Sequence, residues 1–241
     1  MKIFSNKELR SMIITLFFEQ LLVMLVGIVD TFVVSSCGEA AVSGVSLVNQ
    51  FNTIFIYLFT ALASGGAIVV SQYIGNKDEK RTILSSSQLL MFSIVFSIVL
   101  SILVLIFNKQ LLGLLFGKVE SDVMKACVTY LRISAYSYPA LAIYNAGAAL
   151  YRSMAKTKVT MYISFAANII NVVGNIIGVY VLKAGVAGVA YPSLISRVFS
   201  AIIITVLCFN KKLEAYYDLK DIFRFDGKML KRILNIAIPN G

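Results

Sequence analysis

The chain has 241 residues, of which 59% are hydrophobic and only 14% are charged, and its mean hydropathy is +0.83. A soluble domain of this length carries more charge, so the composition indicates an integral membrane protein. Histidine is absent, which excludes Ser-His-Asp catalysis and every histidine-based metal site. The net charge of +10 would suit nucleic acid, but the basic residues lie between apolar segments. Positive flanks of that kind are typical of membrane spans, so we expect no nucleic-acid partner.

Six apolar segments of membrane-spanning length follow one another along the chain. They cover residues 11–36, 43–74, 82–107, 126–151, 159–182 and 185–209, and a seventh begins at Met229 and is cut at Gly241. A helix needs about 20 apolar residues to cross a bilayer. The sequence therefore predicts an all-α integral membrane protein, a six-transmembrane-helix bundle.

The charged loops predict an orientation. The N-terminus and the second, fourth and sixth loops hold 16 basic residues, against four in the other loops. This bias places the N-terminus in the cytoplasm of a multi-pass protein of the plasma (inner) membrane. The first apolar run is too long for a signal peptide and is interrupted by Glu19 and Gln20, so we expect it to be retained.

Two loops are more than simple links. Residues 108–125 mix an apolar Leu/Phe face with charges, which predicts a short helix lying on the membrane surface. The long charged loop 210–228 is expected to connect two halves of a larger protein.

A weak internal repeat supports that division. Lys7-Glu8-Leu9-Arg10 can be aligned with Lys228-Met229-Leu230-Lys231, where a second six-span unit would begin. We therefore predict a six-span lobe over 1–209, a connector over 210–228 and the start of a second lobe over 229–241. The 241 residues are not expected to transport without that second lobe.

Two carboxylates lie inside the first span. Glu19 and Asp30 are separated by 11 residues, close to three helical turns, so they share one stripe of the helix. An ionisable group inside a membrane costs several kcal/mol and usually faces a bundle interior or a water-filled cavity. A pair of buried acids that only fix helix packing is the alternative.

Polar residues in two later spans are expected at the same depth as Asp30. Asn168, Asn171 and Asn175 share one helix face, and Ser193 enters the sixth span from the same side. A carboxylate, amide oxygens and a hydroxyl are ligands for a hard cation such as Na⁺. The acid can carry a proton instead. We therefore predict an ion-coupling site at Asp30, Asn171, Asn175 and Ser193, whereas Asn168 could equally serve helix packing.

Prolines interrupt two of the spans. Pro192 lacks the N–H that would bond the carbonyl of Gly188, and Pro139 lies among tyrosines and an asparagine. Irregular backbone of this kind is tolerated beside a polar cavity. The candidate cavity-lining residues are Glu19, Gln20, Asn168, Tyr138 and Asn145. Arg197 lies deep in the sixth span without an assigned partner.

Several stretches occur along the chain in a recognisable order. They are GIVDTFVVSSCGEAAVSGVSL, SGGAIVVSQYIGNKDEKR, ALYRSMAKTKVTMY, NIINVVGNIIGV followed by AGVAGVAYPSLISR, and ILNIAIPNG. Together they resemble one known family, the multidrug and toxic compound extrusion (MATE) transporters. The resemblance implies twelve spans in two six-span lobes and export of organic cations or amphipathic compounds in exchange for Na⁺ or H⁺. Asp30 stands where that family has its first-lobe acid, with Asn171, Asn175 and Ser193 at partner positions. Asn175 replaces an aspartate found in some members, and Ala155-Lys156 replaces the usual Gly-Asp.

The leading interpretation is thus a secondary antiporter that exports organic cations or amphipathic xenobiotics, with Na⁺ or H⁺ as the coupling ion and no other cofactor. Its expected partners are membrane lipid, a small-molecule substrate and the second lobe of the same chain. A lipid-linked saccharide flippase is the alternative within the same superfamily. A membrane enzyme would need a carboxylate-only mechanism, and an assembly protein would not need the polar residues at one depth, so we predict a non-enzyme.

Overall fold

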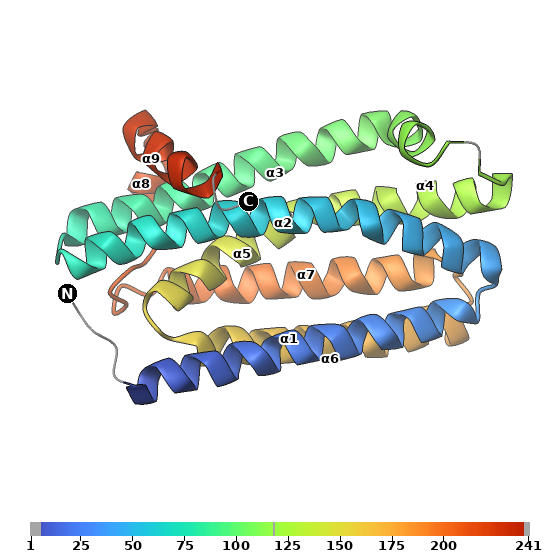
Figure 1. Cartoon of the computed structure of the whole chain (residues 1–241), viewed down its shortest axis with the longest axis horizontal. Coiled ribbons are helices and arrows are strands. Elements are labelled where there is room, and N and C mark those ends of the chain that lie inside the picture. The colour runs from blue at the N-terminus through green and yellow to red at the C-terminus, as the bar shows by residue number, and fades with distance from the viewer. Residues whose placement is uncertain (1–5, 118, 239–241) are drawn as a thin grey trace.

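The computed structural model describes residues 6–117 and 119–238, and these form an almost wholly helical bundle (Figure 1). The helices are α1 (Asn6–Ser35), α2 (Glu39–Gly75), α3 (Glu79–Phe116), α4 (Ser121–Tyr136), α5 (Tyr138–Ser153), α6 (Thr157–Ile176), the π-helical turn η1 (Ile177–Val181), α7 (Ala187–Cys208), α8 (Leu219–Phe223) and α9 (Gly227–Ala237). In the described part, five helices are long and apolar enough to cross a membrane, with α6 and η1 counted as one. The predicted all-α bundle is confirmed; the last residues of the expected seventh span, 239–241, lie outside the described residues.

The fourth predicted span, 126–151, is formed by two helices in succession. Helix α4 ends at Tyr136, and α5 begins at Tyr138 with Pro139 in its first turn. Proline is tolerated there because its missing N–H would have had no helical partner. The break that the sequence predicts at Pro139 is therefore present, and α4 with α5 replaces one continuous span.

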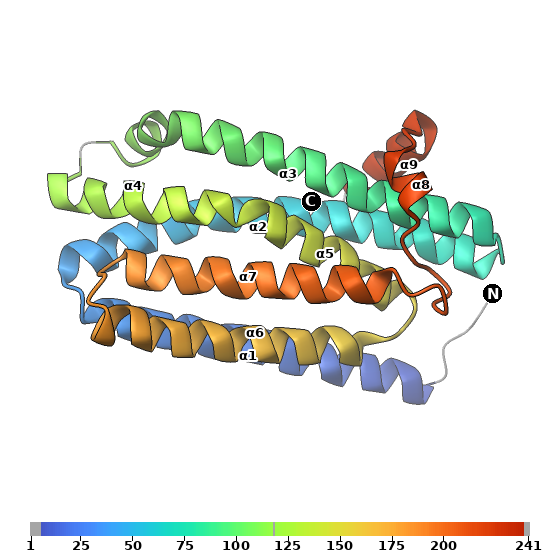
Figure 2. The same cartoon turned by 180° about the vertical axis from the view of Figure 1, so that it is seen from behind.

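The helices pack in a consistent order across the bundle. Helices α2 and α5 lie centrally, α1 lies along α6 on one side, and α3 lies along α4 on the other (Figures 1 and 2). Helix α7 packs against both α5 and α6. The buried apolar residues between α2, α3, α4 and α5 form the main core, with Tyr138 and Leu131 fully enclosed.

The loops divide between the two ends of the bundle. The start of α1, the α2–α3 turn, the α5–α6 turn and the segment after α7 all lie at one end, which we call the basic end (Figure 1). The α1–α2, α3–α4 and α6–α7 connections lie at the opposite end (Figure 2). The loops rich in Lys and Arg are therefore gathered at one end, as the sequence predicts; that this end faces the cytoplasm stays a prediction.

The predicted surface helix in the third loop is largely an extension of α3. The backbone departs from helical angles at Phe107 (φ −99°, ψ 15°) and then continues as helix to Phe116. Gly117 ends it with φ +66°, a conformation that favours glycine. Beyond the kink Leu114 is 84% exposed, so this short segment presents apolar surface away from the bundle.

The predicted connector is bound to α3 by side-chain hydrogen bonds. Gln88, which is fully buried, donates to the carbonyl of Asp221 at 2.7 Å and accepts from the N–H of Asp226 at 3.1 Å. Ser87 accepts from the N–H of Asp218 at 3.0 Å. The polar Ser and Gln residues inside α3 therefore satisfy the backbone of the connector, which includes α8.

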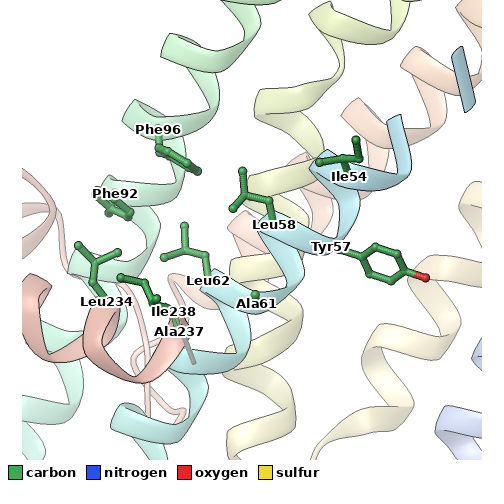
Figure 3. Close-up of a pocket in the computed structure, with 10 residues that line it drawn as sticks. All are labelled: Ile54, Tyr57, Leu58, Ala61, Leu62, Phe92, Phe96, Leu234, Ala237 and Ile238. Atoms are coloured by element: carbon green, nitrogen blue, oxygen red, sulfur yellow. The ribbon is translucent and has the colours of Figure 1, made fainter. Parts of the chain in front are cut away.

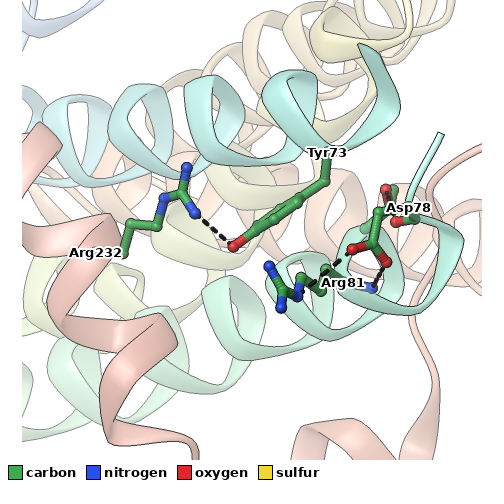
Figure 4. Close-up of polar contacts among 5 residues, drawn as sticks. Tyr73, Asp78, Arg81 and Arg232 are labelled. Carbon is green, nitrogen blue, oxygen red and sulfur yellow. Dashed lines mark hydrogen bonds and ion pairs between the residues drawn. The ribbon is translucent and has the colours of Figure 1, made fainter. Parts of the chain in front are cut away.

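Helix α9 docks on the basic end of α2 through an arginine. Arg232 donates to the Tyr73 hydroxyl at 2.7 Å (Figure 4), and its guanidinium lies 4.9 Å from the centre of the Tyr73 ring. It also donates to Gln72 Oε1 at 2.9 Å. Arg81, which is paired with Asp78 at 3.5 Å, lies 5.9 Å from the centre of the same ring. Two cations thus share one aromatic side chain.

Candidate functional site

A polar cavity of about 470 Å³ lies among α1, α2, α5, α6 and α7. We call it the lobe cavity. Its charged lining residues are two acids, Glu19 and Asp30, and two arginines, Arg152 and Arg197. The two acids lie on one stripe of α1, as their spacing predicts, and both face the cavity.

Asp30 is reached by a chain of hydrogen bonds from α6 and α7. The amide nitrogen of Asn175 donates to Asp30 Oδ1 and also lies 3.1 Å from Asn171 Oδ1. The amide nitrogen of Asn171 donates to Ser193 Oγ at 2.9 Å, and that hydroxyl donates to the carbonyl of Val189 at 3.2 Å. The structure therefore brings together the four residues that the sequence nominates for ion coupling; their role stays a prediction.

Close contact of α6 and η1 with α7 positions these hydrogen-bonded side chains. A Cβ added at Gly188 would lie 2.6 Å from the carbonyl oxygen of Gly178, and one added at Gly174 would lie 2.7 Å from Pro192 Cβ. Real Cβ atoms do not approach so closely, so glycine is required at this crossing. The π-helical turn η1 begins directly after α6 at the same place, and π-bulges often accompany functional sites.

Arg197 lines the same cavity as Asp30. Its guanidinium donates to Ser137 Oγ at 2.7 Å and interacts electrostatically with Asp30. Sequence reasoning gave Arg197 no partner, because Ser137 is distant in the chain and only the break between α4 and α5 exposes its hydroxyl to α7. The presence of Pro139 two residues later was the available signal.

Glu19 occupies the part of the cavity nearer the basic end. It is 8% exposed, and the Tyr144 hydroxyl lies 3.4 Å from Glu19 Oε1 and 3.4 Å from the carbonyl of Thr160. Gln20, Asn145 and Asn168 line the cavity as well, together with Tyr144. These predicted lining residues are therefore placed together by the structure.

Tyr138 is a correction to the predicted lining. Its side chain is fully buried, its hydroxyl donates to Asn52 Oδ1 at 2.7 Å, and its ring stacks on Phe55 with 4.7 Å between ring centres. As the first residue of α5 it points into the core between α2 and α5, whereas Tyr144 points to the cavity. Counting around the helix could not separate the two, because the helix starts anew at Tyr138.

Some lining residues were not singled out from the sequence. Arg152 was counted among loop charges, and Ser164, Ser196 and Ser200 resemble the many serines of these spans. Helical spacing is the signal that could have found the pair on α7, since Ser193, Ser196 and Ser200 lie at i, i+3 and i+7.

Two of the further hollows outside the lobe cavity are lined in part by α9. One, of about 800 Å³, lies at the basic end beside Gln72, Arg232 and Glu214, and Arg152 lines both this hollow and the lobe cavity. The other, of about 560 Å³, is an apolar groove between α2, α3 and α9, where Leu58, Phe96 and Leu234 face one another (Figure 3).

These apolar spans around a polar cavity define a multi-pass α-helical membrane protein. A sequence model of the MatE family matches residues 15–177, and the chain belongs to that family of transporters. The prediction of a MATE-type lobe is confirmed.

The curated relatives are about twice as long as this chain. An uncharacterized transporter, YisQ of Bacillus subtilis (strain 168), is 27% identical over 229 residues, which cover 93% of this chain and 50% of the relative. A probable multidrug resistance protein, NorM of Thermotoga maritima, is 24% identical over 238 residues, which cover 97% of this chain and 50% of that protein. The chain thus spans about half the length of these relatives.

Solved structures share the fold. A crystal structure of MATE in the bent conformation superposes with a TM-score of 0.89 at 22% identity, over 98% of this chain and 52% of that one. An outward-facing multidrug resistance MATE family transporter of the MOP superfamily gives 0.87 at 22% identity, over 94% and 50%. In both comparisons the chain covers about half of the solved structure, as expected for one lobe of a two-lobe transporter.

Proposed function

We propose that this chain is the first lobe of a secondary antiporter that exports organic cations or amphipathic xenobiotics in exchange for inward Na⁺ or H⁺. The observation that carries the proposal is the Asp30 carboxylate, held by the amide of Asn175 at the wall of a polar cavity inside a membrane bundle. A carboxylate with amide and hydroxyl neighbours can take either a hard cation or a proton. Release of that ion is what would couple its gradient to substrate export.

The alternative of a lipid-linked saccharide flippase has less support. Such a protein would favour a large, strongly cationic cavity for its anionic lipid. Two carboxylates balance two guanidiniums in the lobe cavity, so its formal charge is close to zero. A non-enzymatic role follows from the same proposal, because the acids are assigned to ion binding.

The remaining parts of the proposal concern placement and partners. We place the basic end in the cytoplasm of a plasma (inner) membrane, because positive flanks favour that side. The second lobe would continue from α9, whose attachment to α2 through Arg232 would set where the two lobes join. Alternating access then requires one lobe to rock against the other around the substrate.

The proposal is tested by drug-resistance profiling of cells that express the full-length gene, with external Na⁺ and pH varied. Asp30→Asn keeps the size and hydrogen bonding of the side chain but removes its charge, so resistance should fall to that of cells without the protein. Asp122→Asn is the matched control, because Asp122 is exposed and bonds only Lys125 and Ser121 among the described residues. Full resistance of the Asp30→Asn cells, at equal membrane abundance, would contradict the proposal.

A further inference from the structure

The part of the lobe cavity nearer the basic end holds buried polar atoms that have no hydrogen-bond partner among the described residues. Glu19 Oε2, Asn145 Nδ2 and Asn168 Nδ2 have no hydrogen-bond partner within the described ranges. Glu19 itself is more than nine-tenths buried and lines the cavity. Buried polar groups are normally satisfied, so three orphans around one cavity call for an occupant.

The carboxylate decides the charge of that occupant. An unpaired ionised carboxylate costs far more free energy to bury than an unpaired neutral amide. The charge of the occupant is therefore set by Glu19 and not by the two asparagines. Its other oxygen, Oε1, has only the Tyr144 hydroxyl at 3.4 Å, a long contact. No ion pair to Glu19 is formed within the part of the chain that the structure describes. A cation or a proton is what this carboxylate lacks.

The charged residues around the cavity do not pair with the Glu19 carboxylate. The charged residues on the other walls of the lobe cavity are Arg152 on α5 and Arg197 on α7, with Asp30 further along α1. Arg197 is bonded to Ser137 at 2.7 Å, and Arg152 donates to the carbonyl of Ala148 at 3.3 Å. From α6, the described residues that line the lobe cavity are all uncharged, and they include Ser164 and Asn168. Both guanidiniums are hydrogen-bonded to uncharged oxygens, and neither forms an ion pair with Glu19 among the described residues.

The orphan amides suit a hydrated cation. The cation can lie against Glu19 Oε2 with the oxygens of its own water ligands turned toward it, and the oxygens of further water molecules in the cavity accept hydrogen bonds from the nitrogens of Asn145 and Asn168. The cavity of about 470 Å³ has room for this, because a water molecule takes about 30 Å³. Along α1, Glu19 lies about 16 Å from Asp30, too far for one ion to serve both acids.

From this geometry we propose that Glu19, Tyr144, Asn145 and Asn168 form a second monovalent-cation site in the lobe, separate from Asp30 and nearer the basic end. The inference rests on the proposed ion coupling and adds a second position at which the transported ion would bind. Arg152 lines both the lobe cavity, which holds the proposed site, and the hollow at the basic end. Na⁺ and a proton can each supply the positive charge that the Glu19 carboxylate lacks.

The test counts bound ions on the purified full-length protein. One arm measures equilibrium binding of ²²Na⁺. The other, in Na⁺-free and weakly buffered solution, measures protons released when a cationic dye is added. In whichever arm the wild type responds, Glu19→Gln should bind one ion fewer and Glu19→Asp should keep the full number with weaker affinity. Glu39→Gln, an exposed acid in the first turn of α2, is the control and should match the wild type.

The outcomes separate this inference from the proposed function. If Asp30→Asn loses an ion and Glu19→Gln loses none, coupling at Asp30 stands and the second site is wrong. If neither variant changes the number, both ideas fail. If each loses one ion and the double variant loses two, both stand. Loss of ions in Glu19→Gln and Glu19→Asp alike, with a lowered unfolding temperature, would make Glu19 a packing residue and overturn the site.

Discussion

At the level of Asp30, α1 meets a continuous chain of hydrogen bonds that runs through Asn175 and Asn171 to Ser193. At the level of Glu19, the same helix meets one long contact from Tyr144 and an oxygen without a partner in the described chain. The two acids are alike in chemistry, helix and face, so their neighbours alone make them different. The first level is organised before any ion arrives, whereas the second leaves its groups unsatisfied until one does.

The largest effect is expected from a change at the contact between η1 and α7, which positions the hydrogen-bonded residues around Asp30. Gly178→Ala would drive a Cβ into the backbone of Gly188, and overpacking of this kind costs about 1–3 kcal/mol or more when backbone must move. We expect a drop of about 3 kcal/mol in unfolding free energy, measured by denaturant titration of the full-length protein in detergent. Gly113→Ala is the control, since a Cβ there meets nothing within 4 Å. Equal stability of both variants and the wild type would show that η1 and α7 are not in close contact.

A smaller effect is expected from removing one link of the chain. Asn175→Ala takes away the donor to Asp30 and to Asn171, and an unmet buried partner costs about 1–3 kcal/mol. The ion concentration for half-maximal transport should rise roughly tenfold or more. Asn235→Ala, which changes an exposed asparagine on α9, should leave it unchanged. If Asn175→Ala and Asn235→Ala give the same half-saturation, the amide chain does not hold the ion.

The smallest effect should come from the Glu19 level. Tyr144→Phe removes a hydroxyl whose contacts to Glu19 and to the carbonyl of Thr160 are both 3.4 Å long, so only about 0.5 kcal/mol, roughly a twofold change in half-saturation, is expected. Tyr162→Phe, 65% exposed on α6, serves as the comparison and should show no change. A tenfold loss in Tyr144→Phe would mean that the Glu19 level is as tightly organised as the Asp30 level.

Much of the fold and part of the site could be predicted because membrane spans are long and apolar and helical spacing is regular. Those two regularities predict the spans and the common face of Asn171 and Asn175. The charges of the loops predict that the basic loops gather at one end, and the missing N–H of Pro139 predicts the break there. These patterns could not tell Tyr138 from Tyr144, since the restart of the helix after Ser137 changes which side each tyrosine takes. The bond between Arg197 and Ser137, and the binding of the connector by Gln88, join residues far apart in the chain. Such pairs depend on how helices pack, which spacing within one helix does not specify.

The central claim is that Asp30 couples an ion gradient to substrate export. It is tested most directly with the full-length protein in liposomes, where a Na⁺ gradient and a pH gradient are imposed separately and accumulation of a cationic dye is followed. The wild type should accumulate the dye against its gradient under at least one of the two, and Asp122→Asn should do the same. Asp30→Asn should let the dye only equilibrate under either gradient. Gradient-driven accumulation by Asp30→Asn at the wild-type rate would contradict the account.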